Sequence, residues 1–136
     1  MKQLIIHTDG GSRGNPGHAA IGVVAYDELK NVVFELSRYI GRKTNNEAEY
    51  EGLIEAVKWL GQQTNLPTQI DIYLDSKLVV EQIQKKWKIK KTRLQGLAAQ
   101  AWQIIDQLST TPGFHHVPRE KNFAADALVN QALDAL

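Results

Sequence analysis

The first third of the chain has the short-period hydrophobic pattern of β-strands. Residues 2–9 form a strand-like run that ends at Asp9, and residues 19–26 are apolar almost throughout, which predicts a strand buried on both faces. Residues 32–40 alternate between apolar and polar side chains, which predicts a half-exposed strand at the edge of a sheet. Because short turns join the three segments, we expect them to pair as antiparallel strands.

The rest of the chain alternates between helix-like and strand-like segments. An apolar stripe at helical spacing is formed by Tyr50, Leu53, Ile54, Val57 and Leu60. Patterns of the two kinds predict helices over 46–61, 77–85, 92–108 and 121–135, and strands over 69–75 and 114–118. Strands separated by helices are joined by right-handed parallel crossovers. The predicted fold class is therefore α/β, with a five-stranded mixed sheet of three antiparallel strands followed by parallel crossovers, and helices on both faces.

Length and composition limit the class of protein. A chain of 136 residues fits a single domain over 1–136, and the absence of cysteine excludes disulfides, cysteine-bound zinc and a thiol nucleophile. The apolar run at the N-terminus is too short for a signal peptide, and no stretch approaches the ~20 apolar residues of a membrane span. We therefore expect a cytoplasmic monomer that does not bind membranes and has no further domain before this one.

Cationic residues are concentrated in one segment, although the formal net charge is only +1. No acidic residue occurs between Glu81 and Asp106, and the segment KKWKIKKTR contributes Lys85, Lys86, Lys88, Lys90, Lys91 and Arg93. A charge run of this kind is most often a solvated surface, but lysines aligned along a groove would bind phosphates. We interpret Trp87, inside the segment, as a core anchor rather than as a platform for stacking bases.

Several acidic residues lie where a fold of this class could bring them together. Asp9 and Asp75 each end a predicted strand, and parallel strands end at the edge where α/β proteins bind ligands. Glu49 and Asp126 lie in the first turns of predicted helices, where the helix dipole favours an acidic residue in any case. Periodicity does not choose between Glu49 and Glu47, which flank opposite edges of the apolar stripe.

Metal binding would follow if the fold gathers these carboxylates. Two unit charges ~5 Å apart repel by about 3 kcal/mol at an effective dielectric constant of ~20, so four together would be destabilising without cations. An all-oxygen site without cysteine suits Mg²⁺ or Mn²⁺. The run GGSRGNPG after Asp9 lacks the ending of a phosphate-binding loop, so it is typical of a flexible hairpin turn, with close approach of a ligand to the backbone as the alternative.

The chain resembles type 1 ribonuclease H in four segments that occur in the family's order: TDGGSRGNPG, TNNEAEY, YLDSKLVV and VPREKNFAADAL. The resemblance extends over nearly the whole chain and implies the ribonuclease H-like fold. It also implies an endonuclease that hydrolyses the RNA strand of RNA–DNA hybrids and leaves 5′-phosphate and 3′-hydroxyl ends. In the family's motif the catalytic glutamate matches Glu49, so the implied catalytic and metal-binding residues are Asp9, Glu49, Asp75 and Asp126.

The same resemblance implies the cofactors and the substrate groove. Two Mg²⁺ ions per active site are implied, with Asp9 bridging both and with Mn²⁺ as an alternative metal. Recognition of RNA through its 2′-hydroxyls is implied as well. The residues implied to line that groove, together with Glu49, are Gly10, Gly11, Ser12, Asn15, Asn45 and Asn46. Arg42 and Thr44 match positions that hold a phosphate of the DNA strand.

The sequence departs from many family members in two places. Their long basic protrusion is reduced here to KKWKIKKTR, which is similar to the compact form of the family and predicts weaker binding of the hybrid. The lysines expected to bind the hybrid are Lys85, Lys86 and Lys88. The histidine that many members carry before the last helix is absent from PREKN, and we assign its assisting role to Arg119. His115 and His116 precede this loop and are expected to be strand residues without a catalytic role.

Other functions stay open from the sequence alone. An integrase-like or resolvase-like nuclease of the same fold would cut DNA and would not need a 2′-hydroxyl, and the TNN segment argues against it. Whether double-stranded RNA is also a substrate is left open by the sequence. An inactive module that only binds hybrids belongs to a different class, but all four acidic residues are present, so nothing in the sequence supports a loss of activity.

Overall fold

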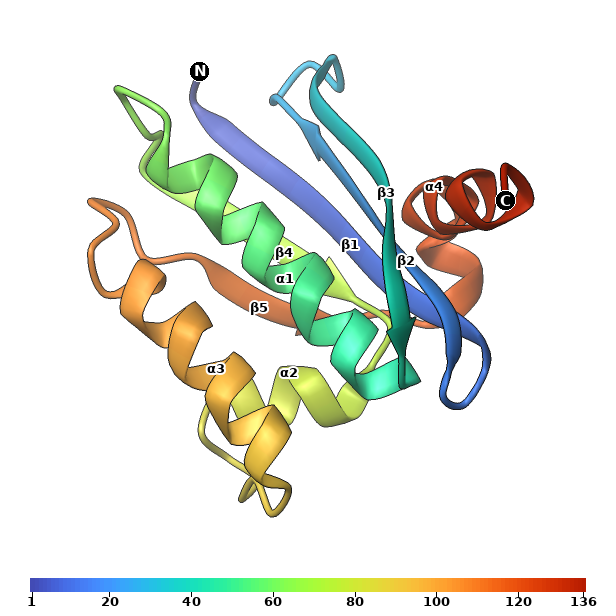
Figure 1. Ribbon diagram of the computed structural model, residues 1–136. Coiled ribbons are helices and arrows are strands. Elements are labelled where there is room, and N and C mark those ends of the chain that lie inside the picture. The colour runs from blue at the N-terminus through green and yellow to red at the C-terminus, as the bar shows by residue number, and fades with distance from the viewer.

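The computed structural model describes residues 1–136 as one five-stranded sheet with helices on both faces (Figure 1). The strands are β1 (Gln3–Gly14), β2 (Gly17–Tyr26), β3 (Val32–Lys43), β4 (Gln69–Leu74) and β5 (Gly113–His116). The helices are α1 (Asn45–Gly61), α2 (Lys77–Ile83), α3 (Thr92–Ile105) and α4 (Phe123–Asp134), with a 3₁₀ turn, η1, at Arg119–Lys121. No helix has the length and apolar character needed to cross a membrane.

The strand order is β3-β2-β1-β4-β5. The pairs β1–β2 and β2–β3 are antiparallel, whereas β1–β4 and β4–β5 are parallel. The predicted α/β class, the mixed sheet and the edge position of the third strand are therefore confirmed. Every predicted helix and strand is present, with ends that differ by a few residues.

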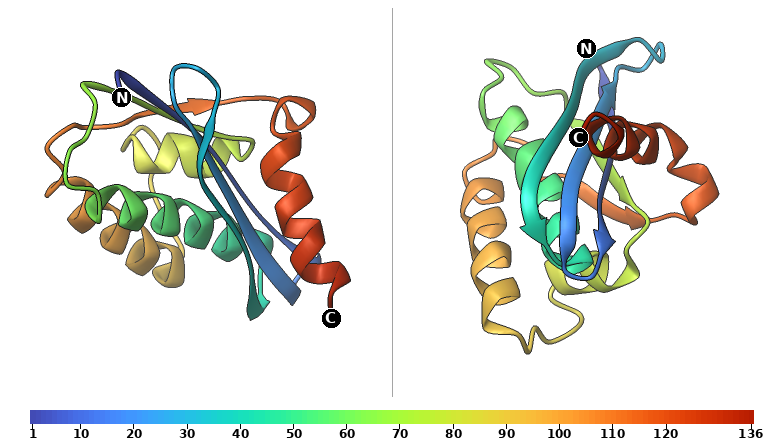
Figure 2. Two further views of the ribbon diagram at one scale, coloured as in Figure 1. Left: turned by 90° about the horizontal axis from the view of Figure 1, so that it is seen from above. Right: turned by 45° about the vertical axis from the view of Figure 1, so that its right-hand side comes forward.

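The two faces of the sheet are covered by different helices. Figure 2 shows α1 and α3 on one side and α4 on the other. The larger core lies under α1 and α3, and the whole predicted stripe of α1 from Tyr50 to Leu60 is buried in it. A smaller cluster lies under α4 and contains Ala20, Val129 and Leu133. Residues 19–25 of β2 are buried because helices cover both of its faces, as the apolar run predicts.

The prediction that the first strand ends at Asp9 was wrong. β1 continues to Gly14 because the glycine-rich run pairs with β2 as far as the pair Gly14↔Gly17, so only Asn15 and Pro16 form the turn. The ladder of backbone hydrogen bonds with β2 overrides the weak strand preference of glycine. Asp9 therefore lies inside a rigid strand and not at the start of a flexible loop.

Two glycines allow the helices to approach the sheet closely beside acidic residues. A Cβ atom at Gly10 would lie 2.1 Å from the carbonyl oxygen of Ala48 in α1, and one at Gly22 would lie 2.3 Å from that of Ala125 in α4. Neither position could accept a side chain unless the helix moved. Because Ala48 and Ala125 directly precede Glu49 and Asp126, these contacts set how close the two acidic side chains come to β1.

Candidate active site

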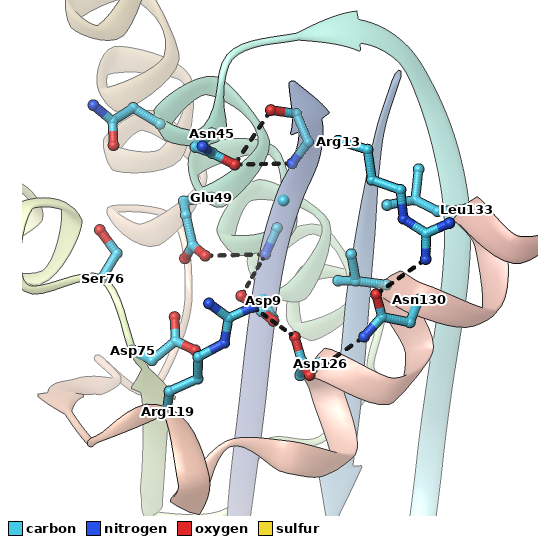
Figure 3. A pocket seen from close by; sticks show the side chains of 15 residues that line it. Asp9, Arg13, Asn45, Glu49, Asp75, Ser76, Arg119, Asp126, Asn130 and Leu133 are labelled. Atoms are coloured by element: carbon cyan, nitrogen blue, oxygen red, sulfur yellow. Dashed lines mark hydrogen bonds and ion pairs between the residues drawn. The ribbon is translucent and has the colours of Figure 1, made fainter. Parts of the chain in front are cut away.

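Three carboxylates meet where β4 ends and β1 continues beyond it. The last paired residues of these parallel strands are His7 and Tyr73, so Asp9 and Asp75 follow two residues later on neighbouring strands. Glu49 reaches the same point from α1. Oxygen atoms of Asp9, Glu49 and Asp75 lie within 4.8 Å of one another (Figure 3). The structure thus brings together three of the four acidic residues identified in the sequence.

Asp126 borders the same cavity from the first turn of α4 but lies outside this group of three. Its Oδ1 atom is 3.4 Å from Nη2 of Arg119, and its Oδ2 atom is 3.4 Å from Nδ2 of Asn130. The Arg119 side chain is exposed and points toward the carboxylates in Figure 3. The cavity therefore has a cation at its edge, at the position assigned an assisting role.

The choice between Glu47 and Glu49 is decided by the start of α1. Glu47 forms a capping box with Thr44: its backbone nitrogen donates to Oγ1 of Thr44 at 3.2 Å, and its Oε1 accepts from the backbone nitrogen of Thr44 at 3.0 Å. Its other oxygen accepts from Nε of Arg93 at 2.9 Å. The bond from the Thr44 backbone and the neighbouring Arg93 hold the pKa of Glu47 below its usual value. Glu47 is thus fully engaged away from Asp9, whereas Glu49 faces it.

Burial dominates the electrostatics of the centre. It raises the pKa of Asp9 to about 7, and the charges of Asp75 and Asp126 add to the increase, while the neighbouring Glu49 carboxyl group and the Gly10 amide oppose it. Burial and the neighbouring Asp9 raise the pKa of Glu49, and burial also raises that of Asp75. Without metal, the Asp9–Glu49 pair therefore retains a proton close to neutral pH.

The donor atoms fit a divalent metal ion. Glu49 accepts a bond from the Gly10 amide through Oε1 at 3.2 Å, but its Oε2 atom is buried and has no hydrogen-bond partner. A buried carboxylate oxygen without a partner is destabilising unless a cation or a proton satisfies it. Carboxylate oxygens without sulfur or imidazole are the ligands of hard divalent cations. Asp9, Glu49 and Asp75 could hold such an ion, and Asp126 is the next carboxylate available.

A cavity of about 510 Å³ surrounds the carboxylates. Of the residues predicted to bind substrate, those that line it are Gly10, Gly11, Ser12, Asn45 and Asn46. Asn45 Oδ1 accepts from the Ser12 backbone nitrogen at 2.9 Å, which joins the two walls of the cavity. Asn15 is not in the lining; its Oδ1 accepts from the Asn45 backbone nitrogen at 3.1 Å and so holds the wall from behind.

Further residues of the cavity were not identified from the sequence. They are Arg13, Ser76 and Asn130, together with the apolar Val129 and Leu133. Asn130 lies four residues after Asp126 on the same face of a helix, a spacing that could have revealed it. Arg13 is drawn toward α4 by Asp134, whose Oδ1 is 2.6 Å from its Nη2, and no local pattern signals this contact.

A second, smaller hollow lies at the start of α1. It is lined by Thr44, Asn46, Glu47, Lys91, Arg93 and Leu94. Asn46 also lines the carboxylate cavity, so the two hollows are adjacent. Arg42 is exposed on β3 and does not line this hollow, although the resemblance pairs it with Thr44. The cations that the structure places beside Thr44 are Lys91 and Arg93.

The basic segment occupies the short connection between α2 and α3, over residues 84–91, without a long insertion. The interpretation of Trp87 as a core anchor was wrong, because its side chain is 45% exposed and lies near Lys77, whose Nζ is 5.9 Å from the ring centroid. Ile89 fills the adjacent core position instead. Lys85 lies over the ring of Trp102 at 4.9 Å. A hollow of about 420 Å³ runs from Trp87 and Lys88 to Asn46.

The two histidines before the last helix lie away from the carboxylates. His115 and His116 are exposed on β5, and neither lines the cavity. His115 Nε2 is 2.7 Å from Oδ1 of Asp71, and its ring lies against Tyr73 with the centroids 5.0 Å apart. Both are thus strand residues, as expected, and the turn that precedes α4 presents Arg119 to the cavity.

Comparisons with known proteins agree with this arrangement. Residues 7–132 match a family model described as reverse transcriptase-like. The bifunctional protein Rv2228c of Mycobacterium tuberculosis is 44% identical over 98% of this chain, which spans only 36% of that relative's length. Ribonuclease H of Clostridium botulinum is 30% identical over 98% of this chain and 97% of its own length.

A solved structure is similar over its whole length. It is LC11-RNase H1, obtained from compost by a metagenomic approach and crystallised with an RNA/DNA hybrid. It is 44% identical, superposes with a TM-score of 0.92 and covers 97% of each chain. Because the family model matches most of the chain and relatives named ribonuclease H match it from end to end, the chain belongs to the type 1 ribonuclease H family, in its compact form.

Proposed function

We propose that this protein is an endonuclease that hydrolyses the RNA strand of RNA–DNA hybrids. The observation that carries the proposal is the cluster of Asp9, Glu49 and Asp75, whose oxygens lie within 4.8 Å of one another at a cavity open to a nucleic acid. The similar LC11-RNase H1 was crystallised with an RNA/DNA hybrid, which supports the choice of substrate. The same cluster argues against an inactive binding module, because binding alone would not require buried carboxylates.

Two divalent ions, Mg²⁺ or in its place Mn²⁺, are the proposed cofactors, held by Asp9, Glu49, Asp75 and Asp126. Bound ions would activate water for in-line attack and stabilise the leaving 3′ oxygen. The ligands would come from β1, the end of β4, α1 and α4. The products would carry 5′-phosphate and 3′-hydroxyl ends. Arg119 offers a guanidinium at the edge of the cavity that could neutralise phosphate charge.

The walls of the cavity offer a way to distinguish RNA from DNA. Ser12, Asn45 and Asn46 line the same cavity as the carboxylates and carry hydroxyl and carboxamide groups. Such groups can exchange hydrogen bonds with a 2′-hydroxyl, which both donates and accepts. These contacts would place the RNA strand, and not the DNA strand, over Asp9 and Glu49.

The DNA strand would follow the positive side of the molecule. Thr44, Lys91 and Arg93, together with Glu47, line a hollow next to Asn46, and the exposed Lys86 and Lys88 add further cations. Contacts of this kind bind any sequence and weaken with salt. All of these residues come from one chain, so we also propose that a monomer is sufficient. A cytoplasmic location stays a separate proposal, and the assay below tests whether double-stranded RNA is also cut.

The proposal is tested with labelled duplexes of one sequence. Wild type and Asp75→Asn are incubated with an RNA–DNA hybrid, double-stranded RNA and double-stranded DNA, each with Mg²⁺, Mn²⁺ or EDTA. We expect cutting of the hybrid's RNA strand that requires metal and is lost in Asp75→Asn. Cutting of DNA would assign the protein to another nuclease of this fold, and binding without cutting would leave a binding module.

A further inference from the structure

Asn122 directly precedes α4, at the position where asparagine usually caps a helix. An asparagine there is favoured because its side chain accepts a bond from a backbone amide of the first turn. Here the side chain makes no such bond, and the residue is only 1% exposed. The carboxamide points instead into the protein toward β1, so helix capping does not explain this residue.

The carboxamide of Asn122 ties the start of α4 to β1 beside the active site. Its Nδ2 donates to the carbonyl oxygen of Thr8 at 2.9 Å, next to Asp9 in β1. Asn122 also acts on the Asp75 carboxylate, where it opposes the effect of burial on the pKa of that group. Its Oδ1 is 2.9 Å from Nδ1 of His7. One buried side chain thus joins two neighbouring residues of β1 to the start of α4.

Two hydrogen-bond partners determine which way this carboxamide faces. The Thr8 carbonyl only accepts hydrogen bonds, so it must face the amide nitrogen. The amide oxygen then faces His7, and the proton of that bond must be on Nδ1 of the ring. The ring itself is held by stacking on Tyr73, with the centroids 5.1 Å apart. The bonds to Thr8 and His7 therefore define a single orientation of the Asn122 carboxamide.

We propose that His7 and Asn122 form a positioning pair for the carboxylate centre. His7 holds the Asn122 carboxamide, and Asn122 holds β1 through the Thr8 carbonyl, directly beside the metal-binding Asp9. Neither residue lines the cavity, so the pair acts through the metal-binding carboxylates and not on the substrate. Hydrogen-bond partners of metal ligands typically change metal affinity or activity by about 10–100-fold when they are replaced.

The test compares two histidines on either side of the same tyrosine. His7→Phe keeps a ring against Tyr73 but cannot donate to Asn122. His115→Phe is the matched control, because His115 also lies against Tyr73 but bonds Asp71, outside the cavity. Both variants are measured in two ways. In the first, Mg²⁺ raises the melting temperature of the protein without nucleic acid, and the concentration that gives half of this increase is the Mg²⁺ midpoint. In the second, kcat and KM are determined on a hybrid.

We expect His7→Phe to raise the half-saturating Mg²⁺ concentration and lower kcat, each by about tenfold, with little change in KM. His115→Phe should match wild type in both measurements. Asn122→Asp, of the same size, should have the larger effect because it removes the donor to the Thr8 carbonyl and adds a negative charge close to the carboxylate centre. It also serves as the test variant if His7→Phe fails to fold.

Two results would overturn the pair. One is an equal change of the Mg²⁺ midpoint and kcat in His7→Phe and His115→Phe. The other is a His7→Phe protein whose melting temperature in EDTA is lower but whose Mg²⁺ midpoint is unchanged, because this indicates a merely structural role. The kinetic part rests on the proposed function, but the Mg²⁺ midpoint does not. A wild type that never cuts hybrids would refute the proposed function, while a shifted midpoint in His7→Phe alone would still support the pair.

Discussion

Replacing Asp9 with asparagine should stabilise the metal-free protein at neutral pH and abolish hydrolysis. The folded protein raises the pKa of Asp9 from 3.8 to about 7, mainly through burial. Between these values the native state binds more protons than the unfolded chain, so stability falls as the pH rises. The loss is absent below pH 3.8 and complete above pH 7. Asparagine stays neutral throughout and can still accept the bond that the Gly10 amide donates to Asp9 at 2.9 Å.

The size of this effect follows from the same shift. A change from 3.8 to about 7 is a difference of about 3 units, and each unit is about 1.36 kcal/mol, which gives a gain in unfolding free energy of up to about 4 kcal/mol at pH 8. At pH 3.5 the gain should be close to zero. Mg²⁺ should reduce the difference at pH 8, because metal bound to the native state stabilises only the wild type.

Urea unfolding in EDTA, at pH values from 3.5 to 8.5, measures both variants directly. Asp134→Asn is the control, because it removes an exposed carboxylate of α4. Its unfolding free energy should not rise relative to wild type as the pH increases. A gain in Asp9→Asn that is the same at every pH would contradict the argument. An Asp9→Asn protein less stable than wild type at pH 8 would refute the claim that burial of this carboxylate is destabilising without metal.

Three further predictions concern the substrate. A triple alanine variant of Lys85, Lys86 and Lys88 should bind the hybrid more weakly, and the slope of log binding constant against log salt concentration should be shallower by up to about 3. Fluorescence anisotropy measures this slope, and an unchanged slope would contradict the prediction. Lys91→Ala should raise KM more than Arg42→Ala, since only Lys91 lines the hollow at Thr44; the reverse order would exclude that hollow as a phosphate site. Arg119→Ala should lower kcat more than it raises KM in steady-state cleavage, and full turnover would remove its assisting role.

The order and type of the elements could be predicted because each has a clear hydrophobic period. The apolar run of β2 reports burial on both faces, and the stripe of α1 is buried as its spacing predicts. The end of β1 could not be predicted, because glycines 10 and 11 have the local character of a turn and only pairing with β2 makes them strand. Tertiary hydrogen bonding overrides local preference there.

The candidate site shows the same division between local and long-range signals. Asp9 and Asp75 are recognisable because parallel strands place their ends together. Periodicity does not separate Glu49 from Glu47, although the capping-box pattern from Thr44 to Glu47 is a local signal that assigns Glu47 to the helix end.

Other contacts leave no trace in a short window of sequence. His7 and Asn122 are 115 residues apart, and their hydrogen bond follows only from the packing of α4 on the sheet. The exposure of Trp87 depends in the same way on which neighbouring side chain, here Ile89, fills the core beside it. Both features therefore depend on residues that are brought together only by the fold, so the local sequence pattern could not predict them.

The most direct test of the carboxylate centre compares two glutamates of one helix. Glu49→Gln and Glu47→Gln differ from wild type by the same chemical change, and glutamine can keep the capping box at position 47. Cleavage of an RNA-labelled hybrid is measured with Mg²⁺ for both variants, after their melting temperatures show that they are folded. We expect that Glu47→Gln still cuts the RNA strand and that Glu49→Gln does not. A folded Glu49→Gln protein that cuts at the rate of wild type would contradict it.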